Sequence, residues 1–176
     1  MPRSLIHPFS SLVACAVLLS AGLSAQSGSY TSYGAPSGSP TFGHHIAISG
    51  TPRIGSSLTV TLGFPPDCGS SAGSPVHWDV FLVTGVSRSA WGGVPLPART
   101  PLGFTLLVAP DWGLHSRALA PMGGPPCPTW GLPGVRHTFS IPSDVRLLGV
   151  EFFQQYVFTE GYAWWATEGG HGVIGA

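Results

Sequence analysis

Glycine and proline divide this chain into short apolar runs, which leaves little room for regular helices. There are 25 glycines and 18 prolines among 176 residues, and only 8% of the residues are charged. Proline removes a backbone donor and glycine loses much entropy when it is ordered, so both interrupt helices and strands. With so few charges the chain also lacks the polar face of an amphipathic helix. Since 43% of the residues are apolar and can bury a core, an all-β domain is predicted.

Short runs of β-branched and aromatic residues between these breaks predict about eight antiparallel strands. Residues 57–62 give the clearest strand, because Leu58, Val60 and Leu62 alternate with polar residues. Two segments rich in glycine and proline, 85–103 and 110–133, are expected to form long loops. The pattern predicts a two-sheet sandwich or jelly roll, with a partly open barrel as the alternative. The other expected strands are 44–49, 76–84, 104–109, 135–141, 149–159, 162–166 and 172–174.

Residues 1–25 have the pattern of a secretory signal peptide. Arg3 precedes an apolar run at 12–23, and small residues follow up to Ala25. The run is shorter than the roughly 20 apolar residues that a membrane span needs, so export with cleavage near Ala25 is expected. The sequence at 12–15 also has the form of a lipoprotein cleavage box, so lipidation of Cys15 at the cell surface is the alternative.

The mature chain is expected to have two parts. Residues 26–43 contain mainly small residues without apolar periodicity, which predicts a flexible lead-in rich in glycine and serine. Residues 44–176 are expected to form the β-sandwich domain. The aromatic residues of the lead-in could instead hold part of it against this domain.

The cysteines predict one disulfide bond. Removal of the leader leaves Cys68 and Cys127, and a pair of thiols closes by default in an oxidising compartment. The bond would close a loop of about 60 residues, which the chain-entropy model values at roughly 4 kcal/mol. Two unpaired buried thiols are the alternative, and the absence of a C-x-x-C spacing argues against a zinc site.

The segment at 141–155 reads I-P-S-D-V-R-L-L-G-V-E-F-F-Q-Q. It resembles the closing segment, I-P-x-D-x-x-L-x-G-x-x-F-x-Q-Q, of an uncharacterised all-β domain in exported proteins of planctomycete-type bacteria. The segment at 49–55 and the strand after it are similar to the opening hairpin of that family. The resemblance, over residues 44–175, implies the fold and export, and it implies no activity.

The same segment can be interpreted from its residues alone. Asp144 is expected to cap one short helical turn over 145–148. Gln154 and Gln155 are expected to lie on opposite faces of a strand, where a buried amide needs hydrogen-bond partners.

Motifs for catalysis or metal binding are weak. Residues 69–73 match the G-x-S-x-G nucleophile elbow, but a strand is expected after them where the motif requires a helix. His44 and His45 are adjacent and so point to opposite faces of a strand, and His137 falls on an apolar face as a core histidine. No H-x-H or H-x-x-x-H spacing occurs. We therefore expect no metal site and no cofactor.

Tryptophans are the better indication of a binding function. Exposed tryptophans offer flat apolar surfaces that stack on sugars or dock on a partner, and packing inside the domain is the alternative. Trp164 and Trp165 are consecutive in an expected strand, so they must point to opposite faces. The candidate stacking residues are Trp91, Trp112, Trp130, Trp164 and Trp165.

The net charge is zero at pH 7, which gives no basic field for binding nucleic acid. The sequence favours an exported, non-enzymatic module that binds a glycan or a cell-surface protein, or that acts as a structural accessory. A small secreted hydrolase with its site in 85–133 is the alternative. An enzyme predicts that Asp111, His115 and Arg117 converge in a cleft, whereas a binding module predicts that they are scattered and that aromatic side chains are exposed together.

Overall fold

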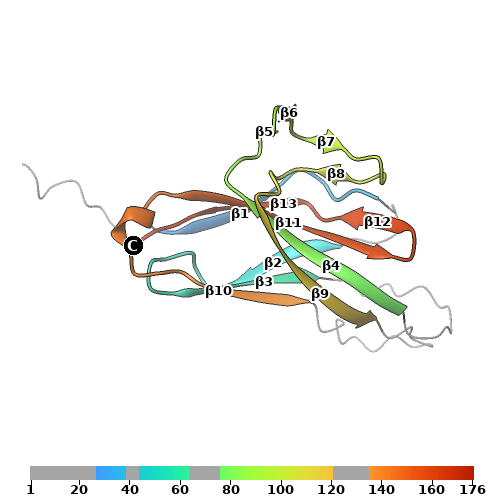
Figure 1. The fold of residues 1–176 in the computed structure, drawn as a ribbon. Coiled ribbons are helices and arrows are strands. Elements are labelled where there is room, and N and C mark those ends of the chain that lie inside the picture. The colour runs from blue at the N-terminus through green and yellow to red at the C-terminus, as the bar shows by residue number, and fades with distance from the viewer. Residues whose placement is uncertain (1–26, 39–43, 64–75, 121–134) are drawn as a thin grey trace, which may run out of the picture.

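The protein is a sandwich of two antiparallel sheets with a further layer of short strands over the larger sheet (Figure 1). A computed structural model describes residues 27–38, 44–63, 76–120 and 135–176. This confirms the predicted all-β class. The elements are β1 (Ser29–Tyr33), β2 (His45–Ser49), β3 (Ser57–Gly63), β4 (Val76–Gly85), β5 (Ala90–Trp91), β6 (Val94–Pro95), β7 (Ala98–Arg99), β8 (Thr105–Leu106), β9 (Trp112–Ala120), β10 (Arg136–Ser140), the 3-10 turn η1 (Val145–Leu147), β11 (Glu151–Glu160), β12 (Ala163–Ala166) and β13 (Gly169–Val173). None of the residues described forms a helix of the length and apolarity that crossing a membrane requires.

The large sheet has the strand order β1-β13-β11-β4-β9, and β12 pairs with the end of β11. Its central strands β4 and β11 carry apolar side chains on both faces. On β4, Val80 and Leu82 belong to the core between the sheets, whereas Val83 packs on the outer face. Both faces are apolar because both are covered, one by the small sheet and the other by the short strands.

The small sheet has the order β10-β3-β2 and lies under the large sheet in Figure 1. The alternation predicted for 57–62 is confirmed, because the side chains of Leu58, Val60 and Leu62 are buried. Burial of such side chains contributes roughly 1.5–3 kcal/mol each. The core between the two sheets consists of Ile46, Leu58, Val60, Leu62, Trp78, Val80, Leu82, Ile141, Tyr156, Phe158, Trp165 and Ile174.

The chain between β4 and β9 folds over the outer face of the large sheet as two small hairpins, β5-β6 and β7-β8 (Figure 1). Leu107 packs there against Phe153. Gln155 holds this layer through its buried amide. Its Oε1 accepts from the Leu107 N–H at 2.9 Å, and its Nε2 donates to the carbonyls of Thr105 at 3.0 Å and Thr167 at 2.8 Å.

The first described strand differs from the flexible lead-in expected at 26–43. β1 pairs along the whole of β13 and forms one edge of the large sheet. Tyr30 lies over Gly170 and Tyr33 lies over Gly169, where a Cβ would meet the tyrosine rings. The two glycines leave the space that these rings fill, so part of the expected lead-in belongs to the sandwich.

The prediction of a loop at 110–133 is wrong for residues 112–120, which form β9. β9 runs antiparallel to β4 over its full length and forms the other edge of the large sheet. Conversely, the strand expected at 104–109 shrinks to the two residues of β8, although Leu107 and Val108 are buried there. β9 was missed because most of its side chains with a described environment are exposed, so its pairing with β4, rather than an apolar pattern, holds it in place.

Candidate functional site

An apolar hollow of about 360 Å³ lies on the outer face of the large sheet. Strands β4, β9, β11 and β12 provide the sheet side of the hollow, and the segment around β8 provides the other side. A volume in this range fits a small-molecule pocket. Its lining residues are Phe81, Val83, Phe104, Leu106, Pro110, Trp112, Gly113, Val157 and Trp164.

Four rings follow one another across this face in nearly parallel planes. The His115 ring stacks on Phe81 with a centroid distance of 4.7 Å, and Phe81 lies 6.1 Å from Trp164. Trp164 in turn lies 6.0 Å from Phe104. The angles between successive ring planes are 28°, 20° and 26°. These rings come from β4, β9, β12 and the residue before β8, so only the assembled sheet creates the array.

Trp112 lies at the edge of the hollow at the start of β9, but its register partner Thr84 places its side chain on the opposite face of the sheet from that of Val83. The next residue, Gly113, has no side chain to fill the hollow. A Cβ at Gly113 would make its nearest contact at 3.6 Å, to the carbonyl oxygen of Leu82, which is ordinary van der Waals distance. Gly113 therefore keeps the hollow open without any strain in the backbone.

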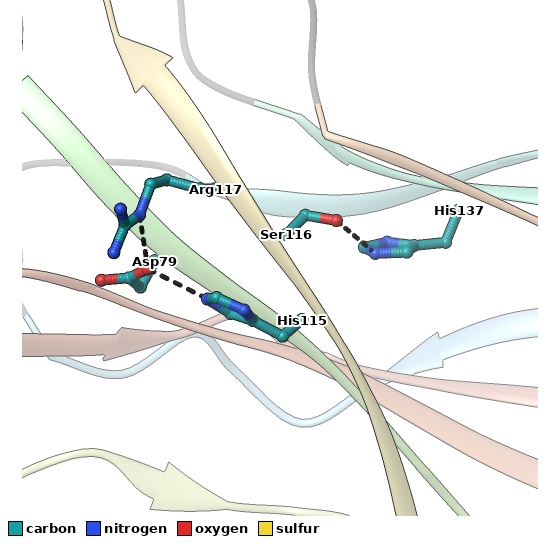
Figure 2. A network of polar contacts seen from close by, with 5 residues as sticks. All are labelled: Asp79, His115, Ser116, Arg117 and His137. Carbon is teal, nitrogen blue, oxygen red and sulfur yellow. Dashed lines mark hydrogen bonds and ion pairs between the residues drawn. The ribbon is translucent and has the colours of Figure 1, made fainter.

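Polar side chains flank the ring array where β4 and β9 pair. The Nε2 atom of His115 lies 2.9 Å from Oδ1 of Asp79, and Nε of Arg117 donates to the same oxygen at 3.3 Å (Figure 2). Arg117 is the direct register partner of Asp79. The hydrogen bond from His115, and then that from Arg117, lowers the pKa of Asp79. The carboxylate therefore stays ionised at neutral pH, beside two cationic or donor groups.

Ser116 points to the opposite face of β9 and joins a polar network between the sheets (Figure 2). Tyr156 Oη donates to the carbonyl of Val60 at 2.9 Å, so it accepts from Nδ1 of His137, 3.0 Å away. Nε2 of His137 then lacks a proton and accepts from the Ser116 hydroxyl at 2.9 Å. This confirms the predicted core histidine, and burial lowers its pKa.

The Ser116 and His137 pair has the hydrogen-bond direction of an activated serine. However, neither residue lines the outer hollow, and both belong to the contact between β9 of the large sheet and β10 of the small sheet. The network includes Tyr156, which is completely buried. We therefore interpret it as a polar link between the sheets.

Buried histidines predict that acid destabilises the fold. His44 packs edge to face on Trp78 and Phe158, and burial lowers its pKa from 6.5 to about 4. The unfolded chain takes up a proton below pH 6.5 that the folded state resists, so stability is complete above this pH and is lost as pH falls towards 4. We expect a loss of about 2 kcal/mol between pH 7 and pH 5 from His44, and His137 acts in the same direction.

Urea unfolding at a series of pH values measures this effect. The His44→Phe variant keeps a ring against Trp78 and should have a shallower dependence on pH between 7 and 5 than the wild type. An identical dependence in the variant would contradict the assignment to His44.

The candidate tryptophans fall into different environments. Trp164 and Trp165 lie on opposite faces of β12, as predicted, but Trp165 is buried in the core, stacked on Trp78 and Phe158. The expectation that Trp165 stacks on a ligand is therefore wrong. Trp91 is exposed on β5 and does not line the outer hollow, whereas Trp112 and Trp164 both line it.

Asp111 does not join the cluster that an enzyme would need. Its carboxylate accepts from the Val86 N–H at 2.9 Å, whereas His115 and Arg117 converge on Asp79. The enzyme alternative therefore grouped His115 and Arg117 correctly but with Asp111 in place of Asp79, and the expectation that these side chains are scattered is wrong for His115 and Arg117. The alternation of β4, which carries Asp79 and Phe81 on the same face, was the available signal.

Several predicted site residues lie outside the described part of the chain. They are Cys15, Cys68, Cys127, Trp130 and the serine motif at 69–73. Within the described ranges, no three His, Cys, Asp or Glu side chains are grouped closely enough to hold a metal ion. No protein-family model, curated protein or solved structure matches this chain.

Proposed function

We propose that this protein is an exported, non-enzymatic β-sandwich module that binds a glycan in the outer hollow. The observation that carries the proposal is the array of His115, Phe81, Trp164 and Phe104 on the outer face. The C–H face of a sugar ring packs on such flat apolar surfaces, and tryptophan combines a large contact area with little loss of conformational entropy.

The polar residues beside the array suit the hydroxyl groups of a sugar. Asp79 supplies acceptor oxygens, and Arg117 and His115 supply N–H donors on the same face of the sheet. Hydrogen bonds to charged groups are stronger than those between neutral groups, which gives orientation to a ligand that otherwise makes apolar contacts. A zero net charge is compatible with an uncharged ligand.

Binding is a better account of this site than glycoside hydrolysis. A hydrolase of the usual kind needs a carboxyl group whose pKa is raised, so that it can protonate the leaving group. The hydrogen bonds from His115 and Arg117 lower the pKa of Asp79 instead. The carboxylate is then suited to accept hydrogen bonds from a bound sugar.

Export to the cell surface or extracellular space is part of this proposal. It is supported by the leader pattern at 1–25, with lipidation of Cys15 as the alternative route, and by the resemblance to an exported family over 44–175. An extracellular location would bring the hollow into contact with polysaccharides.

Two tryptophans, one inside the hollow and one outside it, test the site. Trp164 belongs to the ring array and lines the hollow, whereas Trp91 is exposed and lies elsewhere. Affinity electrophoresis against a panel of soluble polysaccharides identifies a bound glycan, and calorimetry then measures its affinity. Trp164→Ala is expected to weaken binding about tenfold or more, because Trp164 lies between Phe81 and Phe104 in the array and central aromatic residues dominate such interfaces. Trp91→Ala should leave the affinity unchanged.

Gly113→Val provides a second test from inside the hollow. A valine fits the backbone there and its methyl groups occupy the space of the ligand, so binding should be lost while the melting temperature is retained. Retention of every polysaccharide by all three variants, or retention of none by the wild type, would contradict the proposal.

A further inference from the structure

A second cavity, of about 210 Å³, opens between the two sheets near η1 and the end of β13. Residues of both sheets form its walls, so it penetrates the sandwich and is distinct from the hollow on the outer face. Trp112 is the one described residue that lines both. The lining consists of Leu58, Thr84, Val86, Trp112, Phe139, Ile141, Val150, Glu151, Phe152, Gln154 and Ile174.

The mouth of this inner cavity is unusually apolar for a surface. Val86 is 64% exposed, Trp112 is 49% exposed and Val150 is 38% exposed. Apolar side chains that cluster in this way around a cavity mark a binding site more often than an ordinary surface. The charged residue at the mouth, Glu151, is itself exposed and pairs with His171 at 3.1 Å, so it remains in solvent.

Polar groups are present deep in the inner cavity. The side chains of Gln154 and Thr84 are both buried. Tyr30 Oη donates to Oε1 of Gln154 at 3.3 Å, and Nε2 of Gln154 donates to Oγ1 of Thr84 at 3.4 Å. An amide has two N–H groups and a hydroxyl oxygen has two lone pairs. After these two contacts, Gln154 keeps one N–H and one lone pair, and Thr84 keeps its O–H and one lone pair, for a molecule in the cavity.

We propose that the inner cavity binds a small, uncharged, mainly apolar molecule with one hydrogen-bonding group. An apolar cavity of about 150 Å³ holds a benzene molecule, so this one accommodates a substituted ring or two fused rings. A charged molecule is excluded because the apolar walls cannot compensate for the loss of its hydration. The single polar group of the ligand would meet Thr84 and Gln154, while its ring packs on Leu58, Phe139 and Phe152.

Indole is the probe, because it is a fused ring with one N–H donor that Thr84 can accept. Calorimetry should give saturable binding to one site on the purified protein. Val150→Trp places a bulky ring at the mouth and should raise the dissociation constant at least about tenfold, which is about 1.4 kcal/mol of binding free energy. Val86→Trp, at another exposed residue of the lining, should act in the same direction.

Val145→Trp is the matched control. Val145 is 69% exposed on η1 and does not line the inner cavity, so this variant should bind indole as the wild type does. Gly113→Val blocks the outer hollow and should also leave indole binding unchanged, which separates this proposal from the proposed glycan site.

Three results would overturn the proposal. The first is the absence of saturable indole binding. The second is binding that neither Val150→Trp nor Val86→Trp weakens. The third is a concentration-dependent dimer in sedimentation experiments that either variant dissociates, because the exposed apolar mouth would then be covered by a second copy of the chain.

Discussion

Tyr156→Phe is expected to lower the free energy of unfolding by about 3 kcal/mol, although it removes one oxygen atom. That oxygen donates to the carbonyl of Val60 and accepts from Nδ1 of His137. All three groups lie between the sheets, so its removal leaves the Nδ1–H of His137 without this acceptor and takes one donor from the Val60 carbonyl, in a region that water does not reach. The loss exceeds the value of one ordinary hydrogen bond because the abandoned groups keep their desolvation penalty.

Urea unfolding of Tyr156→Phe measures this loss, and Tyr162→Phe is its control. Tyr162 is fully exposed, so the same substitution there should change stability by less than about 0.5 kcal/mol. A double variant, Tyr156→Phe with His137→Leu, also removes the abandoned donor. It should be more stable than the sum of the single effects predicts. Additive losses, or equal losses for the two tyrosine variants, would show that the network does not link the sheets.

Gly85→Ala is expected to destabilise the protein by more than about 3 kcal/mol, because the new methyl group would overlap the backbone of Ala109. The segment around Ala109 is held by hydrogen bonds on both sides of its contact with Gly85. Ala109 N–H donates to the carbonyl of Ser87 at 2.8 Å, and Val86 N–H donates to Asp111 at 2.9 Å. Gly85 and Ala109 cannot move apart without the loss of one of these hydrogen bonds.

Gly113→Ala is the matched control for Gly85→Ala. A Cβ at Gly113 makes only an ordinary contact, so alanine there should change stability by less than about 0.5 kcal/mol. Thermal unfolding of both variants measures the difference. If Gly85→Ala melts like Gly113→Ala, the layer over the outer face is not anchored at Ala109, and the shape of the outer hollow would need to be revised.

Features that depend on neighbours in sequence were predictable. Asp144 accepts from the Arg146 N–H at 2.9 Å and caps η1, as expected for an aspartate before a helical turn. Gln154 and Gln155 are both buried and bind different partners, because adjacent residues of a strand point to opposite faces. Trp164 and Trp165 separate for the same reason.

Two edge strands carry no strand pattern of their own, because remote residues hold them in place. β9 lacks an apolar alternation of its own, and its backbone is ordered by pairing with β4, more than 20 residues earlier at its nearest register pair. β1 has no apolar run either. Its aromatic side chains are accommodated by the glycines of β13, at the far end of the chain.

The sequence by itself determined the all-β class, the strongest strands and the faces of their side chains, since these follow from a two-residue period and from glycine and proline breaks. It also identified Trp112 and Trp164 as candidate binding residues. Only the tertiary structure decided that Trp165 is buried and that Phe81 and Phe104 join Trp164 in one array. Strand order and layer packing bring distant residues together, and no local pattern encodes that order.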